Sequence, residues 1–142
     1  MSIQGILDRK GASVVTIGAA ATVKTAADEM RSRNISALVV KGGDLVLGVV
    51  TDRDIVHAIS MRGAHALGIP VTIVAQRMVT VAPSDTAKTA MNLMTRHRVR
   101  HLPVLADGEL VGIVSIGDVV KDRLGDLELE SSVLRDLYIA AR

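Results

Sequence analysis

The chain contains an internal duplication, and this repeat limits its fold more than any other feature of its 142 residues. Shifting the sequence by 64 positions (80 − 16) aligns the two copies without a gap. Identical residues include the Lys-Thr-Ala tripeptides at 24–26 and 88–90 and the glycines Gly48 and Gly112. A unit of about 45 to 50 residues is too small to bury both faces of a sheet alone. We therefore expect two like units packed with pseudo-twofold symmetry.

Each copy predicts the element order β-α-β-β-α, a mixed α/β (α+β) fold. In the first copy a short strand at 14–17 is followed by a helix that starts near Thr22. In the second, a strand at 79–81 is followed by a helix that starts near Asp85; both helices show apolar residues at helical spacing. Apolar runs joined by Gly-Gly-Asp or Asp-Gly predict hairpins at 37–50 and 101–114. Second helices are expected at 52–61 and 116–124. The expected division is an N-terminal segment 1–13, repeat one 14–62, a linker 63–78, repeat two 79–124 and a C-terminal helix 125–142.

The same motif launches the second helix of each repeat. It reads Gly, two β-branched residues, a hydroxyl, two variable residues and an aspartate, at 48–54 and 112–118. The hydroxyls of Thr51 and Ser115 fall at the N-cap, and Asp54 and Asp118 fall in the first turn. Helix N-termini hold phosphate, and a carboxylate one turn along can accept hydrogen bonds from ribose hydroxyls. The motif therefore suggests a nucleotide, although ordinary helix caps would have the same residues.

The tail carries an apolar seam with alternating spacings of four and three. Its members are Val120, Leu124, Leu127, Ser131, Leu134, Tyr138 and Ala141. This periodicity predicts a helix whose seam either covers the protein's own sheet or pairs with a second subunit. Gly125 could interrupt this helix. Because 49% of the residues are hydrophobic, we favour a homodimer.

Composition removes several classes of function. The absence of cysteine excludes disulfides and thiolate sites. A single aromatic residue, Tyr138, leaves no stacking platform for single-stranded nucleic acid, and the net charge is only +2. The sequence has no apolar run of the ~18–20 residues that a membrane span needs and no signal-peptide pattern, so we expect a cytoplasmic protein.

Neither a metal site nor an enzyme is expected. His97 and His101 are four residues apart, but the chain passes from helix to strand between them, so they do not share a helical face. His57 and His65 have no carboxylate or cysteine partners at ligand spacing. No arrangement of Ser, His and Asp suggests a nucleophile.

The duplicated unit with its paired motifs resembles the CBS domain pair (cystathionine-β-synthase domains, or Bateman module), over residues 14 to about 124. The resemblance implies a small stand-alone module that binds an adenosyl compound in clefts between the repeats. The ligands it implies are AMP, ADP, ATP, NAD(H) or S-adenosylmethionine. It further implies a homodimeric sensor, not a catalyst, which signals by conformational change to an effector protein that the sequence does not identify.

The resemblance also assigns roles to residues by position. It makes Asp54 and Asp118 the ribose ligands and Thr51 and Ser115 hydroxyl contacts to phosphate or ribose. It assigns the adenine edge to Thr16 and Thr80, and the adenine faces to Ile35, Ala37 and Val99. The phosphate candidates are Arg53, Arg98, Arg100 and His101, the last three within the basic run 96–101. The first repeat is less basic at this place, so we expect two unequal sites.

Two other readings stay open. The basic run at 96–101 is also compatible with nucleic acid, although a small-molecule phosphate explains a basic cluster beside two ribose motifs more economically. The chain is alternatively an interaction module that has kept the fold and lost the ligand.

Overall fold

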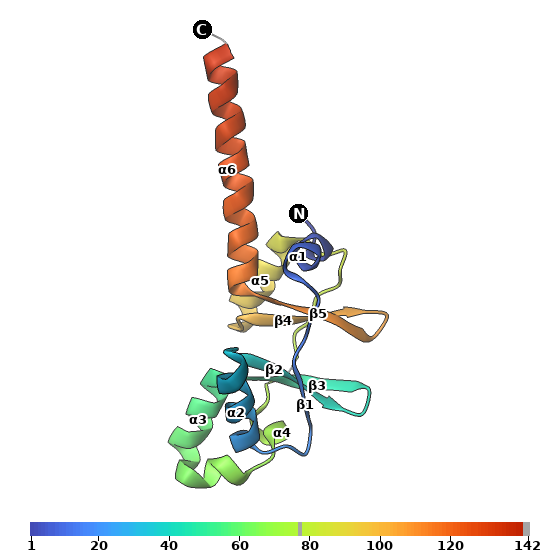
Figure 1. Ribbon diagram of the computed structural model, residues 1–142, viewed down its shortest axis with the longest axis vertical. Helices are drawn as coiled ribbons and strands as arrows, with labels where there is room; N and C mark the ends of the chain where they lie inside the picture. Colours follow the sequence, from blue (N-terminus) through green and yellow to red (C-terminus); the bar gives the residue numbers. More distant parts are fainter. Residues whose placement is uncertain (77, 141–142) are drawn as a thin grey trace. The chain divides into compact units, whose positions relative to one another are not determined.

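The computed structural model describes residues 1–76 and 78–140 and divides the chain into two compact units (Figure 1). One unit is the continuous segment Ser13–Val79. The other combines Met1–Ala12 with Thr80–Arg142. Each unit contains one copy of the repeat; the β-α-β-β-α order predicted from the sequence is complete in the first, and in the second its first strand is an isolated bridge.

The unit Ser13–Val79 is built on a three-stranded sheet in the order β1-β2-β3. Strand β2 lies in the middle, parallel to β1 and antiparallel to β3. The strands are β1 (Thr16–Gly18), β2 (Ala37–Gly42) and β3 (Leu45–Thr51). The helices are α2 (Val23–Arg33), α3 (Asp52–Arg62), the 3-10 helix η1 (Gly63–Gly68) and α4 (Val71–Val74). The segment predicted as a linker at 63–78 therefore holds two short helices.

Helix α2 shows how the sequence sets these elements. The side chain of Thr22 accepts a hydrogen bond from the Thr25 backbone N–H and starts the helix. Asn34, in the left-handed conformation, ends it. Its buried face consists of Val23, Ala26 and Met30, which belong to a core that also contains the strand residues Leu38, Val40 and Val50. Burial of this face against the sheet stabilises the unit.

The second unit has a two-stranded antiparallel sheet of β4 (His101–Ala106) and β5 (Glu109–Ser115). Its helices are α1 (Ile3–Lys10), α5 (Ala87–His97) and α6 (Ile116–Ala140). The strand predicted at 79–81 is reduced to one parallel bridge from Val81 to Val104. The helix predicted from Asp85 begins at Ala87, because the Thr86 side chain accepts from the Thr89 N–H and caps it.

The duplication extends to the details of the hairpins. Ala37 pairs with Thr51 in the first, and His101 pairs with Ser115 at the equivalent place in the second. Both hairpins also shift register at one matching point, between Val40 and Lys41 and between Val104 and Leu105. The two repeats therefore have the same strand register as well as the same order of elements.

Each repeat is completed by a helix that precedes the other repeat in the chain. Helix α1 lies in the second unit, where the Ile3 N–H donates to the Asp85 carbonyl (2.8 Å) and Ile3, Ile6 and Leu7 are buried. Helix α4 and its flanks lie in the first unit. There, Pro70 pairs with Thr22 and Gln76 pairs with Val49.

Helix α6 is continuous over 25 residues. Gly125 does not interrupt it, since an exposed helical glycine costs only about 1 kcal/mol. Only Val119 and Asp122 of this helix are buried. In the described part of the chain, no helix has the length and apolar content of a membrane span.

Candidate functional site

The first candidate site is the turn at which β3 passes into α3. The Oδ2 atom of Asp54 accepts hydrogen bonds from the Thr51 backbone N–H (2.9 Å) and the Thr51 hydroxyl (3.0 Å). The Thr51 Oγ1 atom accepts in return from the Asp54 N–H (3.3 Å). This reciprocal capping box fixes the carboxylate at the end of the sheet. Among residues 1–76 and 78–140, the hydrogen bonds that Asp54 accepts all use Oδ2, which leaves Oδ1 as the oxygen to face a ligand.

The second candidate site repeats this geometry where β5 passes into α6. Asp118 Oδ2 accepts from the Ser115 N–H (2.8 Å), and Ser115 Oγ accepts from the Asp118 N–H (3.2 Å). An additional group approaches from α1. The ammonium of Lys10 donates to Asp118 Oδ2 (2.7 Å) and to the Ile113 carbonyl (2.8 Å). The two carboxylates therefore share a position and differ in their surroundings.

These surroundings lower the pKa of the Asp118 carboxyl below its ordinary value. Partial burial by itself would raise this pKa, because it removes water from the charged form. The hydrogen bonds from Lys10 and from the Ser115 N–H, together with the positive charge of Lys10, outweigh the burial. Asp118 is thus held ionised as a hydrogen-bond acceptor.

The other residues assigned to the first site lie at the same end of its sheet. Ala37 is buried at the start of β2 and pairs directly with Thr51. Thr16 begins β1, the strand on the other side of β2, and pairs with Val39. Ile35 packs against the core just before β2. Arg53 is exposed in the first turn of α3, where its N–H donates to Asp52 Oδ1 (2.8 Å).

The residues assigned to the second site gather in the same way around β4. His101 begins this strand and pairs with Ser115, while the Arg100 carbonyl accepts from the Ile116 N–H (2.8 Å). Arg98 ends α5 in the left-handed conformation, and Val99 follows it partly buried. Thr80 precedes Val81, the residue that bridges to β4. Arg98 and Arg100 are both exposed.

A hollow lies beside each aspartate, at equivalent places in the two units. The hollow beside Asp54 measures about 460 Å³ and lies between α3 and the α4 segment; its lining includes His57, Ala58, Ile73 and Val74. The hollow beside Asp118 measures about 140 Å³; it is lined by Ile6, Arg9, Lys10, Asp118, Lys121 and Asp122. The 64-residue shift relates residues of the two linings to each other. Ala58, Ile73 and Val74 beside Asp54 correspond to the charged residues Asp122, Arg9 and Lys10 beside Asp118.

The charged lining comes from residues that the sequence analysis did not assign to a site. Lys10 contacts Asp118, and Arg9 forms an ion pair with Asp122, whose side chain is completely buried. These pairs join residues more than one hundred positions apart. The 64-residue shift hints at these residues, because it aligns the N-terminal helix with the segment before the second repeat. It does not show that α1 lies in the second unit and α4 in the first.

The histidines lie where the sequence placed them. His97 ends α5 and His101 begins β4, while His57 and His65 are exposed. Among residues 1–76 and 78–140, there is no group of three or more His, Asp or Glu side chains arranged to hold a metal ion.

Comparison with known proteins identifies the family. The family model described as "CBS domain" matches the chain twice, at residues 7–61 and 71–125, which together make up more than half of its length. The chain belongs to the CBS domain family. The two matches coincide with the two repeats, so the protein is a tandem CBS pair.

Individual relatives agree with this assignment. The mitochondrial CBS domain-containing protein CBSX3 of Arabidopsis thaliana is 38% identical over 106 residues, or 70% of this CBS pair; the match spans 52% of the plant protein. The crystal structure of ATU1752 from Agrobacterium tumefaciens is 39% identical, with a TM-score of 0.84, and the match covers 87% of this chain and 99% of that one. PAE2072 from Pyrobaculum aerophilum, solved in complex with AMP, is 29% identical with a TM-score of 0.79, over 92% and 99% of the two chains.

Proposed function

We propose that this CBS pair binds adenosyl ligands at the ends of its two sheets and serves as a regulatory sensor, not a catalyst. The observation that carries the proposal is the repeated carboxylate. Asp54 and Asp118 are held by the same backbone cap hydrogen bonds at the same register position. A similar protein, PAE2072, was solved with AMP.

In this proposal the cap and the ligand use different oxygens. Oδ2 of each aspartate stays in the capping box, and Oδ1 accepts hydrogen bonds from the ribose hydroxyls. The adenine lies against Ile35 and Ala37 in the first unit and against Val99 in the second, with its edge at the backbone of Thr16 or Thr80. Aliphatic contacts suffice, because adenine presents a flat apolar face.

The two sites differ in the ligand charge that they favour. In the first unit, Asp52 adds a negative charge at the start of α3, and its carboxylate already occupies the Arg53 N–H. The equivalent of Asp52 in the second unit is Ile116. Lys10, Arg98 and Arg100 add positive charge there. We therefore propose that the second site takes the ligand with more phosphate groups and the first a less charged adenosyl compound.

Ligand binding in the second unit is coupled to helix α1. Lys10 shares Asp118 Oδ2 with the cap, so a ligand that reaches this carboxylate either gains Lys10 as a phosphate contact or displaces it. Both outcomes change how firmly α1 is held. A ligand shifts such an equilibrium only by its different affinities for the two states. Helix α1 is thus the element through which we expect occupancy to reach a partner protein.

Thermal shift and isothermal titration test the proposal with AMP, ADP, ATP, NAD⁺, NADH and S-adenosylmethionine. At one hundred times its dissociation constant, a ligand that binds only the folded protein adds about 2.7 kcal/mol of stability. Asp54→Asn and Asp118→Asn keep an oxygen for the cap and remove the charge, so each should abolish one binding event. Asp28→Asn, on the exposed face of α2, is the matched control.

The competing reading is a CBS pair that only mediates interactions between proteins. The capping boxes are compatible with this alternative, since they explain why both aspartates are held in place even without a ligand. Failure of all six compounds to shift the melting temperature supports this reading. A shift that survives the double substitution contradicts the assignment of the two aspartates.

A further inference from the structure

The C-terminal part of α6 presents an apolar surface that its own unit does not cover. We define the α6 seam as Val120, Leu124, Leu127, Ser131, Leu134 and Tyr138; Ala141, the last member predicted from the sequence, lies outside the described residues. Every residue from Leu127 to Ala140 is exposed, and the exposed fractions of Leu127, Leu134 and Tyr138 are 50%, 61% and 67%. Apolar side chains exposed in such a row mark an interaction surface.

The seam points away from the face by which α6 packs on its unit. The packed face is formed by Val119, Asp122 and Asp126, of which the first two are buried and the third is half-buried. At about 100° per residue, the seam lies roughly a third of a turn around the helix from this face. Packing of α6 on its own unit therefore leaves the seam residues exposed to solvent.

The spacing of the seam is that of a coiled coil. Its members alternate by four and three residues, which places Leu124, Ser131 and Tyr138 at a positions. Val120, Leu127 and Leu134 then take the d positions. The buried Asp122 falls at f, opposite the seam, as expected for a helix that packs on its unit with one side and on a partner with the other.

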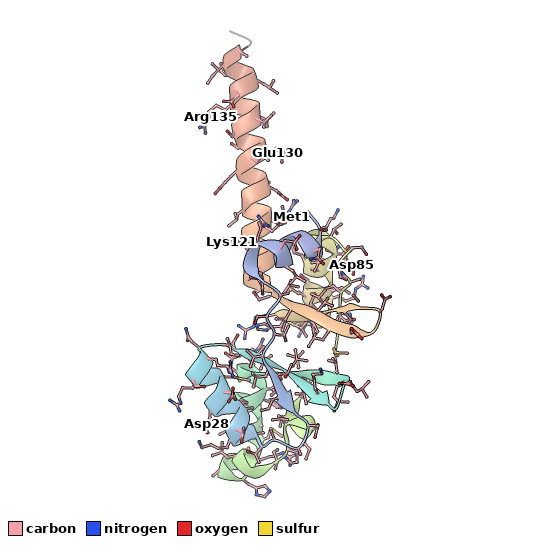
Figure 2. The ribbon with its side chains drawn as sticks, turned by 45° about the vertical axis from the view of Figure 1, so that its right-hand side comes forward. Met1, Asp28, Asp85, Lys121, Glu130 and Arg135 are labelled. Atoms are coloured by element: carbon pink, nitrogen blue, oxygen red, sulfur yellow. The ribbon has the colours of Figure 1, made fainter. Side chains whose placement is uncertain are left out.

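The charged residues beside the seam are complementary to those of a second copy of the same helix in parallel orientation. In a parallel pair, a g residue faces the e residue five positions later on the other helix. Arg123 would face the partner subunit's Glu128, and Glu130 would face the partner subunit's Arg135. Both contacts join opposite charges, and two-fold symmetry makes each of them twice. Figure 2 shows Glu130 and Arg135 on the part of α6 that extends beyond the rest of its unit.

An antiparallel pair is less favourable. There, g residues face g residues and e residues face e residues. The register that overlaps most of the seam brings Glu130 against the partner subunit's Glu130 and Lys121 against the partner subunit's Arg135. These contacts are repulsive, so the charge pattern discriminates between the two orientations.

We propose that α6 pairs in parallel and in register with α6 of a second copy, forming a two-stranded coiled coil over residues 120–140. The occupant of the seam is the same helix of another chain. This proposal is independent of the ligand proposal, because the seam contains none of the residues assigned to the nucleotide sites.

Cross-linking at a single position tests register and orientation together. The chain has no cysteine, so one introduced thiol is the only one present. Ser131→Cys lies at an a position, where a parallel pair in register brings the two Cα atoms within the about 4.4–6.8 Å that a disulfide needs. Ser132→Cys lies at b and is the matched control. In a glutathione redox buffer, we expect most of the first variant and little of the second to form a disulfide-linked dimer.

Exchange of charged residues provides a second test. Sedimentation across a concentration series measures the mass of the species in solution, which is 15.0 kDa for one full chain and twice that for a dimer. Glu128→Arg opposes Arg123 of the partner and should weaken the dimer at least tenfold. Arg123→Glu combined with Glu128→Arg should restore it, whereas Glu128→Arg combined with Arg135→Glu should not.

Three outcomes would overturn the proposal. They are a wild-type chain that stays monomeric, equal cross-linking of the two cysteine variants, and rescue by the Glu128/Arg135 exchange, which would indicate an antiparallel pair. Ligand-induced thermal shifts measured on the same variants keep this result separate from the nucleotide sites.

Discussion

Two aspartates at equivalent positions of a duplicated motif have different neighbours, and the cause is the composition of one short helix. The positions equivalent to Arg9 and Lys10 are Ile73 and Val74. The cationic pair of α1 therefore meets Asp118 and Asp122, whereas the apolar pair of α4 lines the hollow beside Asp54 and Ala58. The duplicated motif supplies the carboxylate, and the neighbouring helix determines its electrostatics.

Replacing Lys10 should expose the pH dependence of Asp118. Because the folded-state pKa of Asp118 is lowered, its contribution to stability is complete above the ordinary aspartate pKa and is lost as pH falls below it. Lys10→Met should cost about 1 kcal/mol at pH 7, near the upper end for an ion pair that water reaches. We expect the melting temperatures of wild type and variant to converge as the pH falls below about 4, the ordinary aspartate pKa, as followed by circular dichroism.

Lys24→Met is the control for this titration. Lys24 pairs with Asp28 on the exposed face of α2, and its substitution should change the melting temperature little at any pH. Parallel curves for wild type and Lys10→Met across the acid range would contradict the role assigned to the Lys10–Asp118 pair.

Removing one partner of the Arg9–Asp122 pair should lower the free energy of unfolding. Introducing the apolar residues found at the equivalent positions of the first unit should restore most of it. Arg9→Ile leaves a carboxylate buried, with its Oδ2 atom lacking any hydrogen-bond partner, and we expect a loss of about 3 kcal/mol. Adding Asp122→Ala reproduces the Ile73 and Ala58 pair of the first unit and should recover most of this loss. Urea unfolding of the single and double variants measures both values; a double variant no more stable than Arg9→Ile would refute the argument.

At the scale of elements, the motif glycines Gly48 and Gly112 show that equivalent positions can be under different constraints. A Cβ at Gly48 would lie 2.7 Å from the Gln76 carbonyl oxygen, a backbone atom of the segment that pairs with β3. A Cβ at Gly112 would lie 2.7 Å from Leu7 Cδ2, the end of a flexible side chain. Gly48 is therefore required by a close backbone approach, and Gly112 only by a side chain that can move.

Gly48→Ala should consequently be more destabilising than Gly112→Ala. Overpacking that forces backbone to shift costs about 1–3 kcal/mol. We expect a loss in that range for Gly48→Ala and a loss below about 1 kcal/mol for Gly112→Ala, because Leu7 can change rotamer. Chemical denaturation of the two single variants gives the comparison, and equal losses would show that the Gln76 segment yields as readily as a leucine side chain.

Most elements could be predicted from the sequence because their signals are local. The apolar periodicity of α2, the threonine cap at Thr22 and the Asp107-Gly108 turn each lie within a few residues of the structure they specify. Asp107 and Gly108 both have positive φ angles, as a tight hairpin turn requires. Some local signals are too weak to decide a structure. Glycine is a poor helix former, but α6 continues through Gly125 because one exposed glycine costs a helix only about 1 kcal/mol.

At the scale of the whole molecule, the exchange of helices α1 and α4 defines the folding units. The duplication predicted two like repeats, and both are present. The sequence alone could not predict that α1 completes the second unit, because hydrogen bonds such as Ile3 N–H to the Asp85 carbonyl join distant residues and follow no local pattern. For the same reason it could not predict Lys10 beside Asp118. The candidate site was thus predictable to the extent that it lies within one repeat.

Fragments should reveal this exchange. Residues 13–79 form one compact unit and should unfold cooperatively on their own. Residues 80–140 should not, because they lack Ile3, Ile6 and Leu7; burial of these side chains contributes about 1.5–3 kcal/mol each, compared with a total stability of about 5–15 kcal/mol. Joining residues 1–12 to residue 80 through a Gly/Ser linker should restore folding, as judged by thermal melts. Cooperative melting of residues 80–140 alone would contradict this view.

The placement of α1 in the second unit also has a consequence for synthesis on the ribosome. Helix α1 leaves the exit tunnel before the segment Ser13–Val79, but the surface that binds it is made of residues translated after that segment. The segment Ser13–Val79 has all of its residues earlier and can complete its fold first. Until the second repeat has been translated, Ile3, Ile6 and Leu7 stay in water, where they are a natural target for the chaperones that meet nascent chains.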